Sequence, residues 1–201
     1  HGRCVVVGGG VCLDIPLAEL AARFAEVVLL DVGFLDRSGP GNVRRVAWDA
    51  AGSLQRWHDD PAMDDTRALA VSDPGWPSDV GAPDLTVSAG VLSQLHILPA
   101  AWLARHRGRP DAFGDALAAA LGRLHLDWLR ARPGRRLLIT DLAEIACERG
   151  GRETERTAIG AGLLDLPAPD AAWWWDIAPA PEVDRHQDRR HHVGAWTLAD
   201  A

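Results

Sequence analysis

The first third of the chain alternates between short apolar runs and one amphipathic stretch. Residues 4–7 form a β-branched run that ends at Gly8-Gly9-Gly10, and residues 26–30 form a second apolar run that ends at Asp31. Between them, the apolar positions of residues 17–24 recur at spacings of three and four, which is typical of one helix face. Continuous apolar runs are typical of strands buried on both faces of a parallel sheet. The pattern therefore predicts a strand, a glycine turn, a helix and a second parallel strand.

The remaining pattern extends this unit into one α/β domain over residues 1–201. Further strands are expected at residues 42–48, 84–89, 136–141, 172–177 and 192–197. Residues 100–132 favour two helices broken near residues 108–110, and residues 58–83 favour an irregular, proline-rich connection. The last two strands are expected to form an antiparallel hairpin, because too little helical pattern separates them for a parallel crossover. We expect a Rossmann-like three-layer α/β/α sandwich with a mostly parallel, seven-stranded sheet.

Composition narrows the classes of function. The net charge of −7 disfavours non-specific nucleic-acid binding, since that needs a basic field. All 21 basic residues are arginine and the chain has no tyrosine, which excludes a P-loop lysine, Schiff-base chemistry and a Tyr/Lys dehydrogenase pair. The three cysteines lack metal-site spacing. No apolar run reaches bilayer length, so a cytoplasmic protein is expected, and the start without Met predicts a missing N-terminal segment.

Candidate binding residues follow the predicted strands. In an open α/β sheet, ligands bind outside the carboxyl ends of the strands. Gly8, Gly9 and Gly10 would let backbone N–H groups approach a ligand closely. Asp31 could accept hydrogen bonds from two ribose hydroxyls, and Asp49 from an adenine amino group. Gly8–Gly10 could also form only a tight turn, and Asp49 could instead cap a helix.

In order and spacing, these motifs resemble the class I S-adenosylmethionine-dependent methyltransferases. The matching segments are Val5-Val6-Val7-Gly8-Gly9-Gly10, Val28-Leu29-Leu30-Asp31, Val46-Ala47-Trp48-Asp49 and Asp84-Leu85-Thr86-Val87-Ser88, together with the terminal hairpin. The resemblance implies methyl transfer from S-adenosylmethionine to a small-molecule acceptor. It also implies cofactor contacts at the glycine turn, Asp31, Asp49 and Ser88, although Ser88 could equally be a small residue that fits between strand and helix.

Two departures from the family pattern keep other functions open. Val6 stands where the family usually has an acidic residue, and Cys12 stands at the third glycine of G-x-G-x-G. These departures motivate a non-catalytic interaction protein on a degenerate methyltransferase fold. An NAD-dependent oxidoreductase is the remaining alternative, with Leu13 in place of the third glycine of the dinucleotide fingerprint.

Several other residues are weaker candidates. His96 could act as a general base, although a packing role is favoured, and Glu144 and Glu182 are possible substrate-side acids. Trp173-Trp174-Trp175 is expected in the core, with a stacking wall for a flat substrate as the alternative. Residues 185–192 are expected to form a solvated basic loop that could face an anion rather than a metal site. The sequence identifies no catalytic residue, methyl acceptor or oligomeric state.

Overall fold

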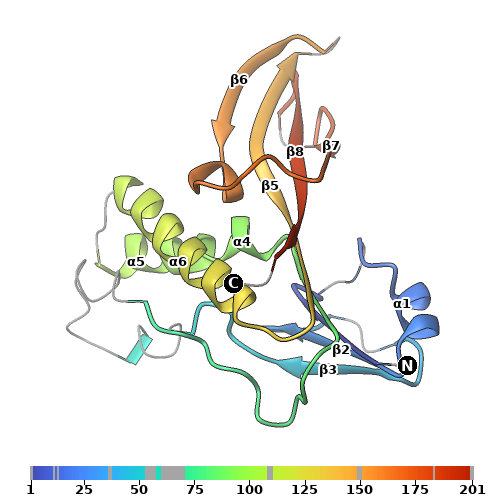
Figure 1. Cartoon of the computed structure of the whole chain (residues 1–201). Helices are drawn as coiled ribbons and strands as arrows, with labels where there is room; N and C mark the ends of the chain where they lie inside the picture. The colour runs from blue at the N-terminus through green and yellow to red at the C-terminus, as the bar shows by residue number, and fades with distance from the viewer. Residues whose placement is uncertain are drawn as a thin grey trace.

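The computed structural model describes residues 2–10, 12, 14–35, 38–52, 58–59, 71–107, 111–148, 151–182 and 184–199. Its elements, labelled as in Figure 1, are β1 (Arg3–Val7), α1 (Leu17–Arg23), β2 (Glu26–Asp31), β3 (Val43–Ala47), β4 (Leu85–Ala89), α4 (Val91–Gln94), α5 (Ile97–Arg107), α6 (Asp111–Arg130), β5 (Arg135–Glu148), β6 (Glu153–Ala158), the 3-10 turn η1 (Gly160–Leu163), β7 (Ala171–Ala178) and β8 (Gln187–Leu198). The predicted strand–glycine turn–helix–strand unit is confirmed.

The strands form one mixed sheet in the order β3-β2-β1-β4-β5-β8-β7, with β6 paired to β5 off this path. β1 to β4 and the first part of β5 are parallel, whereas β8 is antiparallel to both β5 and β7. The chain moves outward from β1 through β2 to β3 and then returns to the other side of β1 as β4. The strand order therefore reverses between β1 and β4, the place where ligands bind in such sheets.

Strand alternation divides the core into two layers. Val5 and Val7 point to one face of the sheet, where they join a cluster with Leu129 of α6. Cys4 and Val6 point to the other face, which Leu20 and other residues of α1 help to cover. All four β1 side chains are almost fully buried. The Rossmann-like α/β/α arrangement follows from these two apolar faces.

The C-terminal part of the sheet differs from the prediction. There are eight described strands rather than seven, because residues 153–158 form β6. β5 continues for 14 residues, well past the six that were predicted, and β8 begins at Gln187. β6, the second half of β5, the first half of β8 and β7 form a four-stranded antiparallel sheet, which we call the arm. It projects beyond the helices in Figure 1. A strand pattern of charged residues such as Glu-Thr-Glu-Arg carries no apolar face, so the period that reveals strands is absent in β6.

The helical prediction holds with one shift. α5 and α6 correspond to the two helices expected between residues 100 and 132, but α5 already starts at Ile97. The expected break at residues 108–110 lies outside the described residues. Among the residues that the structure describes, no helix is both long and apolar enough to cross a bilayer.

Candidate cofactor site

A cavity of about 170 Å³ lies at the carboxyl ends of β1, β2 and β4, where the strand order reverses. It is lined by Val7, Gly8, Leu30, Asp31, Val32, Trp48, Asp49, Ala50, Ala51, Ala89, Gly90, Val91, Gln94, Leu95, Leu98 and Pro99. Three of the predicted site residues, Gly8, Asp31 and Asp49, are thus brought together. Ligand pockets commonly measure roughly 300–1,000 Å³, so this cavity suits one part of a nucleotide-type cofactor better than the whole molecule.

Gly8 is a position that only glycine can occupy without strain. Its φ is +95°, and a Cβ there would lie 2.2 Å from the carbonyl oxygen of Ala89 and 2.5 Å from Cγ2 of Val91. The bare backbone of Gly8 therefore packs against the end of β4 and forms part of the cavity wall. Gly9 and Gly10 do not line the cavity, since a Cβ on either would instead approach Leu29 or Asp31.

Asp31 fixes the glycine turn to the end of β2. Its Oδ2 accepts a hydrogen bond from the backbone N–H of Gly10 at 2.9 Å, and its Oδ1 accepts one from Gly33 at 3.3 Å. A carboxylate has about four acceptor positions, so these two bonds leave acceptor capacity on the carboxylate. Asp31 thus supports the turn and also presents a negative charge to the cavity.

Trp48 and Asp49 form the β3 side of the cavity. Oδ1 of Asp49 accepts a hydrogen bond from the N–H of Ala51 at 2.9 Å, a turn contact related to the capping role considered above. The ring of Trp48 lies 5.0 Å from that of Trp128, and Trp76 stacks on Trp128 at 5.8 Å. This packing gives the cavity one rigid aromatic wall beside a carboxylate.

The ionisable side chains that line the cavity are all acidic. Among the described lining residues, Asp31 and Asp49 are the ionisable side chains, and none is basic. Two carboxylates repel a phosphate or pyrophosphate group and attract a cation or a hydroxyl hydrogen. The charge of the cavity therefore disfavours a ligand with phosphate groups and favours one that carries hydroxyl groups or a positive charge.

Ser88 lies behind this site rather than in it. Strand alternation directs its side chain toward α6, where Oγ lies 2.8 Å from Nε2 of His125 and both residues have no exposed surface. Burial lowers the pKa of His125 to about 4, so the ring is neutral at pH 7. The Ser88 side chain thus packs between strand and helix, as one of the two interpretations of the sequence expected. A contact between the Ser88 backbone and a cofactor stays a prediction.

The two departures from the family pattern have clear structural settings. Val6 is 1% exposed and packs in the core, where a carboxylate would need a partner. Cys12 has a φ of +56°, in the left-handed region that favours glycine. Its thiol donates to the carbonyl of Gly9 at 2.8 Å. The chain thus keeps a glycine-type conformation at Cys12 without the glycine.

A second polar cluster joins α4, β5 and β8 next to the cavity. Asp141 accepts a hydrogen bond from Oγ of Ser93 at 2.5 Å and lies 3.0 Å from Nδ1 of His191, whose Nε2 is 3.4 Å from Glu144. Burial opposes the charge on Asp141, but the bonds from His191 and Ser93 outweigh it and lower its pKa. The hydrogen bond to Asp141 raises the pKa of His191. Glu144 also accepts from Arg189 at 2.9 Å, so this acid belongs to a structural network.

The other weaker candidates lie away from the cavity. His96 does not line it, and burial lowers the pKa of this side chain. Glu182 lies in the exposed turn between β7 and β8. The core prediction for Trp173, Trp174 and Trp175 is wrong, because all three are 42–45% exposed on the edge strand β7.

The basic segment was also predicted incorrectly. Its residues from Gln187 onward belong to strand β8, and Arg189 and Arg190 pair with acidic side chains of neighbouring strands, Glu144 and Asp176. Arg189 and Arg190 project from opposite faces of β8, and their partners lie on β5 and β7, respectively. A loop prediction missed this pairing because it depends on residues distant in sequence.

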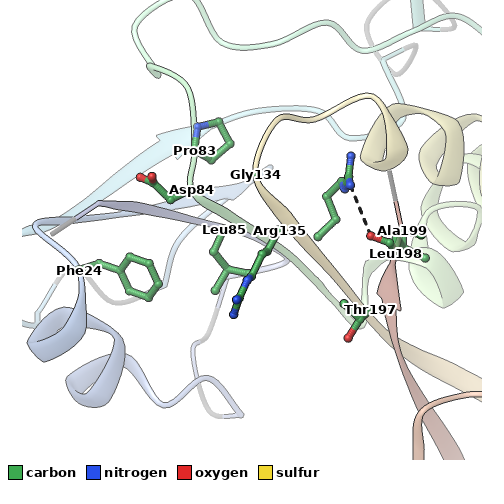
Figure 2. Close-up of a pocket in the computed structure, with 10 residues that line it drawn as sticks. Phe24, Pro83, Asp84, Leu85, Gly134, Arg135, Thr197, Leu198 and Ala199 are labelled. Atoms are coloured by element: carbon green, nitrogen blue, oxygen red, sulfur yellow. Dashed lines mark hydrogen bonds between the residues drawn. The ribbon is translucent and has the colours of Figure 1, made fainter. Parts of the chain in front are cut away.

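A larger cavity of about 810 Å³ lies at the opposite end of the sheet. Figure 2 shows Asp84 at the start of β4, Arg135 at the start of β5, and Thr197 and Leu198 at the end of β8 around it. It is an open depression at the amino-terminal ends of the parallel strands. Since Rossmann-like sheets bind ligands at the carboxyl ends, the smaller cavity is the better candidate.

Several residues that line the cavity were not predicted from the sequence as cofactor contacts. Trp48 stands directly before Asp49 at the end of a predicted strand, and this position could have identified it as a cavity residue. Gly90, with a φ of +68°, follows β4 in the same way. Gln94 and Leu98 carry no comparable signal, because only the packing of α4 and α5 brings them to the cavity.

No known protein family and no curated protein matches the chain in sequence. In structure it is similar to a candidate type II methyltransferase from Anaeromyxobacter dehalogenans. The two share 12% sequence identity and a TM-score of 0.38, over 99% of this chain and 91% of that protein. The fold assignment above rests on the strand order and not on this similarity.

Proposed function

We propose that the protein binds S-adenosylmethionine and transfers its methyl group to a small-molecule acceptor. The observation that carries the proposal is the cavity at the strand-order reversal, with two carboxylates, one tryptophan and no basic side chain among its described lining residues. S-adenosylmethionine is a nucleoside with a cationic sulfur, and it supplies an activated methyl group when bound.

The chain's own residues would position the cofactor. Asp31 would accept hydrogen bonds from ribose hydroxyls through the acceptor positions not used by Gly10 and Gly33. Trp48 would contact the adenine ring, with Asp49 near its amino group. Methyl transfer depends mainly on positioning and on exclusion of water, so an obvious catalytic dyad is not required. The methyl acceptor and a cytoplasmic location remain predictions.

The proposal is tested by titrating the protein with S-adenosylhomocysteine in a calorimeter. Asp31→Asn keeps the shape of the side chain and removes its charge. Loss of charge-assisted hydrogen bonding of about 1.5–3 kcal/mol should weaken binding roughly 10- to 150-fold. Asp127→Asn removes a charge on the exposed face of α6 and should leave affinity unchanged. Thermal melting of each variant separates lost binding from lost folding, which matters because Asp31 also holds the turn.

The same titration distinguishes the alternatives. Folded wild-type protein that binds NADH and not S-adenosylhomocysteine would support an oxidoreductase, although the two carboxylates disfavour its pyrophosphate. Protein that binds neither ligand would support the non-catalytic alternative. Two observations favour the non-catalytic alternative over the oxidoreductase: the small volume of the cavity and the packing of Gly8 against Ala89 and Val91.

A further inference from the structure

The arm has two outer strands of very different character. β6 and β7 are its edge strands, and every residue of β6 is exposed. β6 carries Glu153, Glu155 and Arg156 along six residues, which is how natural sheets discourage edge-to-edge pairing. β7 has eight residues and one charge, Asp176, which is already paired with Arg190 at 2.5 Å. Of the two edges of the arm, β7 is therefore the less protected: it lacks the charges of β6, and the register shift in its pairing with β8 lies at its end, between Asp176 and Ala178.

The apolar side chains of β7 remain exposed on both faces of the arm. Trp173, Trp174, Trp175 and Ile177 are 42%, 45%, 44% and 41% exposed, respectively. Trp173 and Trp175 point to one face and Trp174 to the other. Trp174 stacks on His192 with ring centroids 4.7 Å apart, so even the tryptophan with an aromatic partner in its own chain keeps nearly half its surface free. Along its outer edge, β7 pairs with no other described strand.

We propose that β7 pairs with β7 of a second copy of this chain, antiparallel and across a two-fold axis. The sequence Ala-Ala-Trp-Trp-Trp-Asp-Ile-Ala has its bulky residues at the centre and small residues at both ends. With the axis at Trp174, Ala172 lies opposite Asp176 of the second copy and Ala171 lies opposite Ile177. No like charges then oppose each other, which a self-complementary interface requires.

The exposed area agrees with a weak dimer. Each of the four apolar side chains exposes roughly 100 Å² of surface. Two copies of the chain together therefore offer about 800 Å² of apolar side-chain surface. The two backbone edges raise the total to about 1,000 Å², near the lower limit for a specific interface. Interfaces of this size are typical of weak association, so we expect a concentration-dependent monomer–dimer equilibrium.

A nucleic-acid partner for the tryptophans is disfavoured by charge. The arginines around Trp174 are paired with acids, Arg156 with Glu153 and Arg190 with Asp176. Phosphate binding needs basic side chains that are free to replace counterions. The neutral β7 edge instead matches another neutral edge of the same length.

The test is analytical ultracentrifugation of the full chain over a concentration series up to about 100 µM. Wild type should shift from monomer to dimer. Trp175→Lys places two like charges at the interface and removes apolar area, and it should weaken dimerisation at least about a hundredfold. Thr157→Lys adds the same charge to the protected edge β6 and should dimerise like wild type. Trp173→Lys provides a second variant of β7, and the melting temperatures show whether each variant is folded.

Hydrogen exchange at low and high concentration provides an independent readout. Amides of residues 171–178 should become protected at high concentration, and those of β6 should not change. A wild-type protein that stays monomeric, or folded Trp175→Lys and Thr157→Lys variants with equal affinities, would overturn the proposal. A monomer that binds lipid vesicles or single-stranded DNA through β7 would also overturn it.

Discussion

Replacement of Gly8 by alanine is the sharpest test of the glycine turn. At a φ of +95°, a side chain costs about 1–2 kcal/mol relative to glycine. The new methyl group would also lie 2.2 Å from the Ala89 carbonyl oxygen, which belongs to β4 and has little room to move. Such overpacking typically costs about 1–3 kcal/mol, so the total loss of stability is about 2–5 kcal/mol. Reduced entropy of the unfolded chain offsets less than about 1 kcal/mol of this loss.

Gly75→Ala is the matched control for this substitution. Gly75 also has a positive φ, +72°, but a Cβ there meets no atom within 4 Å. It should therefore lose only the conformational contribution of about 1–2 kcal/mol. The difference between the two variants isolates the contact between the glycine turn and β4.

Urea unfolding measures both variants. The midpoint should fall much further for Gly8→Ala than for Gly75→Ala, with the slope of the transition unchanged. Equal losses in the two variants would refute the reasoning, because they would mean that Gly8 is not packed against Ala89. Since total stability is typically about 5–15 kcal/mol, Gly8→Ala should remain measurable in most of this range.

Two further predictions concern the buried His125 and the partly buried His191. Ser88→Ala removes the hydrogen-bond partner of His125 and should cost about 1–3 kcal/mol, whereas the double substitution with His125→Leu should recover part of this loss in urea unfolding. The lowered pKa of His125, about 4, means that unfolding takes up a proton, so wild-type stability should fall between pH 6.5 and 4 and the double variant should show a weaker slope. For His191 the effect of pH on stability has the opposite sign. Its pKa is raised in the folded protein, so the stabilisation from its ion pair with Asp141 is complete below its ordinary pKa and is lost as the pH rises through the folded pKa. The stability difference between wild type and His191→Gln should therefore shrink as the pH rises above about 6.5, and a constant difference would contradict the ion pair with Asp141.

The sequence by itself determined the parallel half of the protein. The apolar runs of β1 and β2 and the helix period between them are local patterns, and they predicted strands, helix and glycine turn. The same patterns placed Gly8, Asp31 and Asp49 at strand ends, which a parallel sheet brings to one edge. This much follows from order along the chain.

Only the tertiary structure decided which side chains face the cavity and how the C-terminal strands pair. Strand alternation and the position of α6 turn Ser88 toward His125, and no local pattern specifies that packing. β5 continues into the arm because β6 and β8 pair with its extension, a long-range choice made by hydrogen bonds between distant segments. Trp173, Trp174 and Trp175 are apolar enough for a core, but β7 is an edge strand and leaves them exposed. Hydrophobicity predicts that a residue favours burial, while the sheet topology determines whether another element covers it.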